Sequence, residues 1–194
     1  MKRIFDIFAS GIGLIILSPI LFFVSVWIKF DSKGPVFYRQ VRVGRGNKDF
    51  RIFKFRSMRI GADKGSLITV GGRDPRITRS GYFIRKYKID ELPQLINVFV
   101  GDMSLVGPRP EVRKYVELYN GEQMRVLSVR PGITDIASIK YRNENEILGG
   151  VDNPDEYYIN VLMPHKLQLN IDYINSRTFF SDIKLILFTV LGKK

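Results

Sequence analysis

A single apolar run dominates the first thirty residues. No charged residue occurs from Ile7 to Ile28, a stretch of 22 residues rich in Ile, Leu, Phe and Val. A helix of this length measures roughly 33 Å at about 1.5 Å per residue, close to the roughly 30 Å of bilayer hydrocarbon. The run is too long for the apolar region of a signal peptide, and no small-residue cleavage site follows it. We therefore expect residues 1–30 to form a retained, membrane-inserted segment rather than a buried core helix.

Positive charges flank this segment on both sides and give it no preferred direction across a bilayer. Lys2 and Arg3 precede it, and Lys29 and Lys33 follow it. Because positive residues near a membrane segment tend to remain on the cytoplasmic side, both ends are expected there.

A proline near the middle of the segment favours a bend. Pro19 cannot donate to the Ile15 carbonyl and its ring crowds that turn, which costs roughly 3 kcal/mol in a regular helix. The Ser18 hydroxyl is expected to bond back to the Leu14 carbonyl and so to favour the bend. We predict a re-entrant helical hairpin, bent at Ser18 and Pro19, that enters and leaves one leaflet. A kinked spanning helix is the alternative.

Beyond Phe30 the pattern becomes that of a charged, folded domain, predicted over residues 31–194. Strand-forming residues at 36–43 and 50–56 predict a β-hairpin rich in Arg and Lys, with its turn at 44–47. Residues 61–76 show weak periodicity and are expected to be loop.

Helical periodicity accounts for most of the remaining chain. The predicted helices are 80–88, 91–100, 111–129 with a break at Gly121, 155–162, 165–175 and 179–191. The last one is strongly apolar but interrupted by Asp182 and Lys184, and both a membrane-interface position and a core position suit it. The expected fold is α/β but mostly helical: a small β-hairpin and amphipathic interfacial helices around a compact cytoplasmic catalytic core.

Charge and composition limit the chemistry and the partners. The 194 residues include 31 Lys and Arg against 19 Asp and Glu, a net charge of +12. This favours anionic partners such as nucleic acid, anionic lipid headgroups or phosphorylated small molecules. A chain with no cysteine and one histidine has no disulfide framework, thiolate nucleophile or multi-His metal centre. Its chemistry must use carboxylates, hydroxyls, Lys, Arg or a bound cation.

Asp90 and Glu91 are the candidate catalytic carboxylates. Asp90 stands where a helix N-cap is expected and Pro93 suits only a first turn, so a helix is predicted to begin here. Both carboxylates would then lie at the positive end of a helix, among the cations of residues 85–88. One could attack a substrate while the other holds a metal ion. The alternative is that Asp90 is only a cap and Glu91 only offsets the helix dipole.

Candidate anion-binding residues lie on either side of this pair. Arg109 stands between Pro108 and Pro110, which restrict its backbone and present a guanidinium suited to phosphate or carboxylate. Lys54 and Arg56 supply further positive charge from the returning strand. Taken alone, each of these is compatible with an ordinary surface position.

Taken in order, these motifs resemble those of bacterial sugar transferases. They are the apolar segment with its central Ser-Pro, KFRSM at 54–58, DELPQ at 90–94, GPRP at 107–110 and PGIT at 131–134. The chain looks like a small monotopic phosphoglycosyl transferase over residues 1–191. Five motifs in order are far more specific than any one of them.

The resemblance implies a membrane-associated enzyme at the cytoplasmic face of a bacterial inner membrane. Such enzymes move a sugar-1-phosphate from a UDP-sugar to polyprenyl (undecaprenyl) phosphate and release UMP. This is the first membrane step in making a glycoconjugate such as capsule, exopolysaccharide, O-antigen or a glycoprotein glycan. The implied partners are these two substrates and membrane lipid, with no nucleic acid, and a homo-oligomer is left open.

The family pattern also implies a role for each site residue. Asp90 would be the nucleophile that forms a covalent phospho-sugar aspartate. Glu91 would assist in placing Mg²⁺ or in handling a proton, and both carboxylates are implied metal ligands. The implied substrate-binding residues are Arg85, Arg109, Lys54, Arg56, Pro108 and Pro110.

The sequence departs from the commonest family pattern at residues 135–140, where DIASIK replaces the usual Gly-Trp-aliphatic continuation. The identity of the sugar is therefore not predicted. The extra N-terminal membrane helices and domain of longer members are absent, so no fused activity is expected. Two other functions stay open: a membrane-tethered basic module that binds nucleic acid or anionic lipid without catalysis, and an enzyme that uses water as the acceptor.

Overall fold

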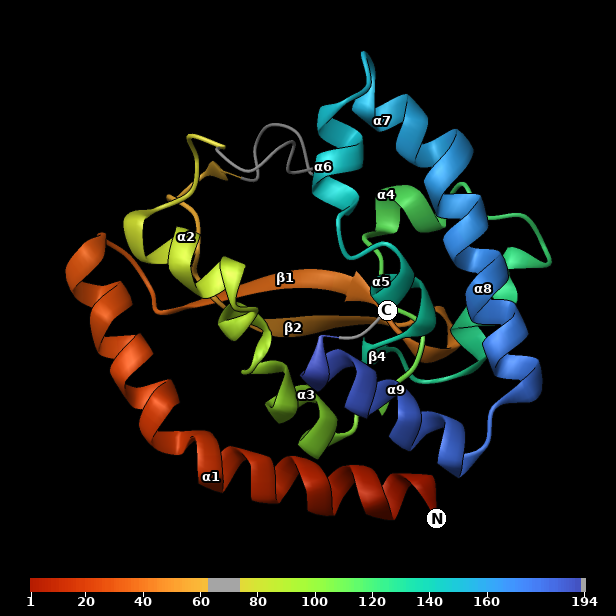
Figure 1. The fold of residues 1–194 in the computed structure, drawn as a ribbon, viewed down its shortest axis with the longest axis horizontal. Coiled ribbons are helices and arrows are strands. Elements are labelled where there is room, and N and C mark those ends of the chain that lie inside the picture. The colour runs from red at the N-terminus through yellow and green to blue at the C-terminus, as the bar shows by residue number, and fades with distance from the viewer. Residues whose placement is uncertain (63–73, 193–194) are drawn as a thin grey trace.

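The computed structural model describes residues 1–62 and 74–192 and shows a mostly helical protein (Figure 1). A long helix, α1 (Lys2–Asp31), lies along one side of a compact body. The strands are β1 (Phe37–Val43), β2 (Asp49–Phe55), β3 (Ser104–Val106) and β4 (Gly132–Thr134). The helices of the body are α2 (Arg79–Lys86), α3 (Gln94–Val100), α4 (Arg113–Val116), α5 (Ile136–Lys140), α6 (Glu144–Gly149), α7 (Pro154–Tyr157), α8 (Met163–Ser176) and α9 (Phe179–Leu191). Short 3₁₀ turns are η1 (Arg45–Asn47), η3 (Ile89–Glu91) and η4 (Gln123–Ser128), and η5 (Tyr158–Leu162) is a π-helical turn.

The predicted β-hairpin is confirmed. β1 and β2 pair antiparallel around a turn that contains η1, with Tyr38 opposite Lys54 and Arg42 opposite Phe50. Because side chains alternate along a strand, Lys54 and Arg42 fall on the same face of the hairpin. Most of the loop predicted at 61–76 lies outside the described residues.

β3 and β4 form a parallel pair that the sequence did not predict. Each strand has only three residues, too few for a recognisable alternation. A Cβ on Gly107 would lie 2.4 Å from the Arg130 carbonyl oxygen, and one on Gly132 would lie 2.1 Å from the Gly107 nitrogen. The two backbones therefore need glycine at both positions, and their contact fixes the segment that leads into Arg109.

Several predicted helix boundaries are wrong. The helix expected over 111–129 is reduced to α4 and η4, and α5 and α6 were not predicted. Asn120 and Gln123 explain the interruption: the Asn120 side chain accepts from the Gln123 nitrogen at 2.9 Å, and the Gln123 side chain accepts from the Asn120 nitrogen at 3.0 Å. These side-chain bonds satisfy backbone nitrogens in a turn, in place of the hydrogen bonds that a continuous helix would make. α2, α8 and α9 agree with the predicted helices to within two residues.

Three apolar clusters hold the described residues together. The largest joins α8 and η5 to the segment between β3 and β4; its members are Val112, Tyr115, Val126, Leu148, Tyr158, Leu162, Met163, Leu167 and Ile171. A second, of Ile52, Val98 and Met103, lies between β2 and α3. The third, of Val24, Ile28, Phe55 and Ile84, joins α1 to β2 and α2.

α1 is continuous, and it is long and apolar enough to cross a membrane. Only 11% of its most apolar window is buried in the protein. Figure 1 shows the helix bent, with its first half alongside α3 and its second half beside α2. The structure therefore shows one bent helix; the predicted insertion into a single leaflet remains a prediction.

Ser18 bonds differently from the prediction. Its hydroxyl donates to the Ile15 carbonyl at 2.7 Å, not to that of Leu14. Ile15 is the carbonyl that Pro19 leaves without a helical donor, because proline has no N–H. The serine side chain thus satisfies the acceptor that the proline exposes.

Both ends of α1 are bonded to the same body. Near the N-terminus, Lys2 forms an ion pair with the buried Asp182 at 2.5 Å. Asp6, 2% exposed, accepts from the Ser104 hydroxyl at 2.9 Å. At the other end, Asp31 accepts from the Ser80 hydroxyl at 2.8 Å. These bonds hold the two ends at fixed positions on one folded unit.

Arg56 also holds the C-terminal end of α1. Its guanidinium donates to the Lys33 and Ser32 carbonyls, both at 2.7 Å, and to the Ser32 hydroxyl at 3.0 Å. Gly34, at φ +127°, leaves room for this contact, since a Cβ there would lie 1.9 Å from Arg56 Nη1. In the structure the Arg56 guanidinium thus donates to carbonyls just beyond the end of α1, and its binding of substrate remains a prediction.

Candidate active site

Asp90 and Glu91 lie in η3, the single turn between α2 and α3. The prediction that Asp90 caps α3 is wrong: α3 begins at Gln94, with Pro93 in the capping position. Lys88 precedes the turn with a left-handed φ of 57°, which redirects the chain after α2. The two carboxylates therefore belong to a tight turn between helices, not to a helix N-terminus.

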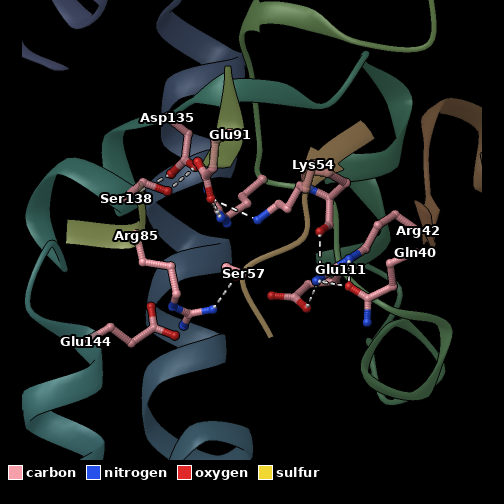
Figure 2. A network of polar contacts seen from close by, with 12 residues as sticks. Gln40, Arg42, Lys54, Ser57, Arg85, Glu91, Glu111, Asp135, Ser138 and Glu144 are labelled. Atoms are coloured by element: carbon pink, nitrogen blue, oxygen red, sulfur yellow. Dashed lines mark hydrogen bonds and ion pairs between the residues drawn. The ribbon is translucent and has the colours of Figure 1, made fainter. Parts of the chain in front are cut away.

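Glu91 is held between two cations. Lys54 Nζ donates to Glu91 Oε1 at 2.9 Å, and Figure 2 shows these two side chains together. Arg109 binds both Glu91 oxygens, with Nη1 donating to Oε2 at 3.3 Å and Nη2 donating to Oε1. This is the bidentate geometry in which a guanidinium fork matches a carboxylate. The structure thus brings together Lys54, Glu91 and Arg109 from three separate segments.

Asp90 differs from its neighbour in having a buried oxygen that is not used. The residue is 7% exposed, and among the described residues its Oδ1 has no hydrogen-bond partner. Burial raises the pKa of Asp90 and the charge of Glu91 adds to this, while Lys54, Arg85 and Lys88 oppose it. A buried carboxylate with a spare oxygen and a raised pKa is a strong candidate for reaction, since such groups cluster at functional sites.

The surrounding charges act on Glu91 in the opposite direction. Burial alone would raise the pKa of Glu91, but Arg109 and Lys54 together hold it well below its ordinary value. Glu91 in turn raises the pKa of Arg109, and burial lowers the pKa of Lys54. Glu91 is therefore a stable carboxylate that pairs with two cations in this structure.

The Arg109 loop is fixed through its main chain. Pro108 and Pro110 are buried; the Pro108 carbonyl accepts from the Gly132 nitrogen at 3.0 Å, and the Pro110 carbonyl accepts from Arg42 Nη1 at 3.0 Å. These bonds hold the backbone on both sides of Arg109, and substrate contact by Pro108 and Pro110 remains a prediction. Little backbone freedom remains at this guanidinium.

Arg42 and Glu111 are site residues that the sequence did not reveal. Arg42 donates to the Gln40 side chain at 2.6 and 3.0 Å and lies 3.6 Å from Glu111, an arrangement visible in Figure 2. Glu111 also accepts from the Tyr158 hydroxyl in the π-helical turn. The position of Glu111 directly after Pro110 was a partial indication of its place in the site. Its partners, however, come from segments distant in the sequence.

Asp135 was noted in the sequence only as part of an unusual segment. It is 1% exposed, caps α5 by accepting from the Ser138 nitrogen at 2.8 Å, and contributes to the raised pKa of Arg109. Arg85, from α2, lies with Nη1 3.5 Å from the Ser57 hydroxyl and also acts on the pKa of Asp90. Both residues therefore belong to the surroundings of the carboxylate pair.

The donor set fits Mg²⁺ only in part. In the described part of the chain, no group of three or more His, Cys, Asp or Glu side chains converges. Mg²⁺ is commonly held by one or two carboxylates together with substrate phosphates, so the unpartnered oxygen of Asp90 is a suitable protein ligand. Glu91 is less suited while its oxygens accept from Lys54 and Arg109.

Comparison with known proteins agrees with these motifs. A family model described as "Bacterial sugar transferase" matches residues 1–192. Galactosyl transferase CpsE of Streptococcus agalactiae is 42% identical over 97% of this chain and 41% of its own length. The UDP-glucose:undecaprenyl-phosphate glucose-1-phosphate transferase of Klebsiella pneumoniae is 38% identical over 97% of this chain and 39% of its own length. Sugar transferase EpsL of Bacillus subtilis is 38% identical over 98% of this chain and 85% of its own length. This chain therefore spans about two fifths of the length of the first two relatives.

Proposed function

The chain belongs to the bacterial sugar transferase family, and on that premise we propose that it transfers a sugar-1-phosphate from a UDP-sugar to undecaprenyl phosphate through a covalent intermediate on Asp90. The relatives named as undecaprenyl-phosphate sugar-1-phosphate transferases support the substrate classes. The observation that carries the mechanism is the buried Oδ1 of Asp90, unpartnered within the described residues, beside a Glu91 that is held by Lys54 and Arg109.

In the first half of the reaction, a carboxylate oxygen of Asp90 attacks the β-phosphorus of the UDP-sugar. An aspartyl oxygen–phosphorus bond forms, the bond from that phosphorus to the bridging oxygen breaks, and UMP leaves with the bridging oxygen. Arg109 and Lys54 offset the charge of the diphosphate as it approaches. Phosphoryl transfer depends mainly on such positioning and charge neutralisation.

In the second half, a phosphate oxygen of undecaprenyl phosphate attacks the same phosphorus. The aspartyl bond breaks, the Asp90 carboxylate is restored, and undecaprenyl diphosphate-sugar leaves. Glu91 keeps the two cations in place through both steps. A bound Mg²⁺, with Asp90 and the diphosphate as ligands, would supply further neutralisation of phosphate charge.

We further propose that α1 enters and leaves one leaflet of the membrane. Its two ends are bonded to the same body, through Lys2 and Asp182 at one end and Asp31 and Ser80 at the other. A helix that crossed a bilayer would leave its ends on opposite sides, where one body could not hold both. The position proposed for the body is the cytoplasmic face of the bacterial inner membrane, where the UDP-sugar and the lipid phosphate meet.

The test is UMP release by detergent-solubilised protein given Mg²⁺, undecaprenyl phosphate and a panel of UDP-sugars. Sustained release that requires both the lipid and one particular UDP-sugar is expected, with no more than about one UMP per protein released when the lipid is left out. Sustained release without the lipid would indicate water as the acceptor. No release with any sugar, together with salt-sensitive binding to nucleic acid, would indicate a basic binding module instead.

A further inference from the structure

An exposed row of aromatic rings connects the apolar helix to the carboxylate turn. The Trp27 ring on α1 lies 5.4 Å, between centroids, from the Phe83 ring on α2, and Phe83 lies 4.8 Å from the Tyr87 ring at the end of α2. The three residues are 41%, 46% and 56% exposed, respectively. Tyr87 stands three residues before Asp90. We call Trp27, Phe83 and Tyr87 the aromatic row.

The row continues onto the exposed face of α1. Phe23, 70% exposed, precedes Trp27 by four residues, so the two side chains lie on the same side of the helix. Figure 1 shows α2 beside the second half of α1, which is where the two helices bring Trp27 and Phe83 together. The exposed apolar surface thus extends from a helix apolar enough to enter a membrane to the turn that carries Asp90. Continuous apolar surface of this kind marks a contact with a ligand or a membrane.

Positive charge gathers at the end of the row nearest Asp90. Lys86 Nζ lies 5.4 Å from the centre of the Tyr87 ring, and Lys88 follows directly. The charges of Lys88 and Arg85 both act on the pKa of Asp90, so they are within electrostatic reach of the carboxylate. The other end of the row has no charge from Phe22 to Ile28. The row therefore has an apolar end and a cationic end.

We propose that the aromatic row binds the polyprenyl tail of the acceptor and directs its phosphate to the cations beside Asp90. This inference rests on the proposed function, which supplies an acceptor with an apolar tail and an anionic head. The two ends of that molecule match the two ends of the row in polarity. The ring faces offer apolar area to isoprene units, and removing that area from water is favourable. The competing explanation is a simple aromatic anchor at the membrane interface.

Steady-state kinetics with Phe83→Ala and Tyr87→Ala test the proposal. The KM for undecaprenyl phosphate should rise about fivefold to tenfold in each variant, while the KM for the UDP-sugar stays within about twofold. Geranyl phosphate, which has only the first two isoprene units, should also lose affinity in these variants, because those units meet the two rings nearest Asp90. Phe83→Leu, which keeps an apolar side chain, should recover most of the affinity for the long acceptor.

Phe180→Ala is the matched control, because Phe180 is an 83% exposed ring on α9, away from α2. If Phe180→Ala and Phe83→Ala raise the acceptor KM equally, the row is a membrane anchor and the proposal is wrong. Unchanged kinetics in both row variants would also overturn it.

A binding measurement separates this proposal from the proposed function. A prenyl phosphate with a diazirine on its first isoprene units should label peptides that contain Phe83 or Tyr87, and undecaprenyl phosphate should compete. Labelling confined to other peptides contradicts the proposal. Failure of the wild-type protein to release UMP would overturn the proposed function, whereas the labelling pattern would still decide whether the row binds the lipid phosphate.

Discussion

Asp90 and Glu91 are neighbours in the chain, yet their carboxylates lie in opposite electrostatic surroundings. Glu91 accepts from Lys54 and Arg109, which lower its pKa, whereas Asp90 has a raised pKa and keeps a buried oxygen to which no described residue donates. One tight turn thus provides an anion that organises cations and an oxygen that is available to react. The proposed reaction assigns these two tasks to the two residues.

Replacing the organising carboxylate should destabilise the protein. Glu91→Gln leaves Lys54 and Arg109 half-buried without their counter-charge, and we expect a loss of about 2–3 kcal/mol in the free energy of unfolding. Urea denaturation in detergent would measure it. Asp49→Asn, which breaks a much more exposed pair with Arg113, should cost no more than about 1 kcal/mol. Equal losses in the two variants would show that Glu91 is not an organising residue.

Removing the reactive carboxylate should stabilise the protein at neutral pH while abolishing turnover. The pKa of Asp90 in the folded protein lies above its ordinary value of 3.8, so the wild-type chain loses stability as pH rises from 3.8 through the folded value. Asp90→Asn carries no such buried charge. The unfolding free energy of Asp90→Asn should therefore exceed that of the wild-type protein at pH 7, and the difference should disappear as pH approaches 3.8.

Denaturation midpoints compared between pH 4 and pH 8 would check this. Asp152→Asn is a suitable control, because Asp152 is exposed. An Asp90→Asn protein that is less stable than wild type at neutral pH would mean that the surroundings of Asp90 stabilise its ionised form, which is the opposite of the direction expected from its raised pKa.

The contact between Arg56 and the end of α1 should matter for folding more than for substrate binding. Arg56→Ala removes donors from the Ser32 and Lys33 carbonyls, and we expect about 2–3 kcal/mol of destabilisation. The remaining folded enzyme should keep its KM for the UDP-sugar. Arg51→Ala, an exposed arginine on the same strand, should change stability by no more than about 0.5 kcal/mol. A large rise in the donor KM with normal stability would instead support the prediction that Arg56 binds substrate.

The membrane arrangement of α1 can be measured with cysteines, since the chain has none. Lys2→Cys and Lys33→Cys place one thiol at each end of the helix. Neither should react with an impermeant thiol reagent added outside intact bacteria, and both should react after the cells are opened. Lys48→Cys, in the exposed turn of the β-hairpin, reports the side on which the body lies. Labelling of only one end in intact cells would mean that α1 crosses the bilayer.

The sequence predicted the chemistry-bearing residues better than their local structure. Lys54, Glu91 and Arg109 were chosen from charge and motif, and the structure brings them together. The capping role considered for Asp90 was wrong because the left-handed Lys88 and a 3₁₀ turn intervene before α3, and neither leaves a periodic signal. The β-hairpin was predictable since both strands have seven residues, whereas three-residue strands such as β3 and β4 depend on a long-range pairing.

The contact between Arg56 and the end of α1 could not be predicted for a similar reason. Its partners, Ser32 and Lys33, stand more than twenty residues earlier, and nothing in the strand pattern distinguishes a guanidinium that holds a helix end from one that meets a phosphate. The same holds for Glu111, whose neighbours Arg42 and Tyr158 come from segments far apart in the sequence. Long-range polar contacts of this kind have no local period to reveal them.

Covalent attachment of the phospho-sugar to Asp90 can be observed by mass spectrometry of wild-type protein quenched shortly after mixing with its UDP-sugar in the absence of lipid phosphate. We expect a mass increase of one sugar phosphate on the peptide that contains Asp90, lost when undecaprenyl phosphate is added and absent in Asp90→Asn. An active preparation in which Asp90→Asn turns over at the wild-type rate, or in which the adduct maps to another residue, would contradict the proposed mechanism.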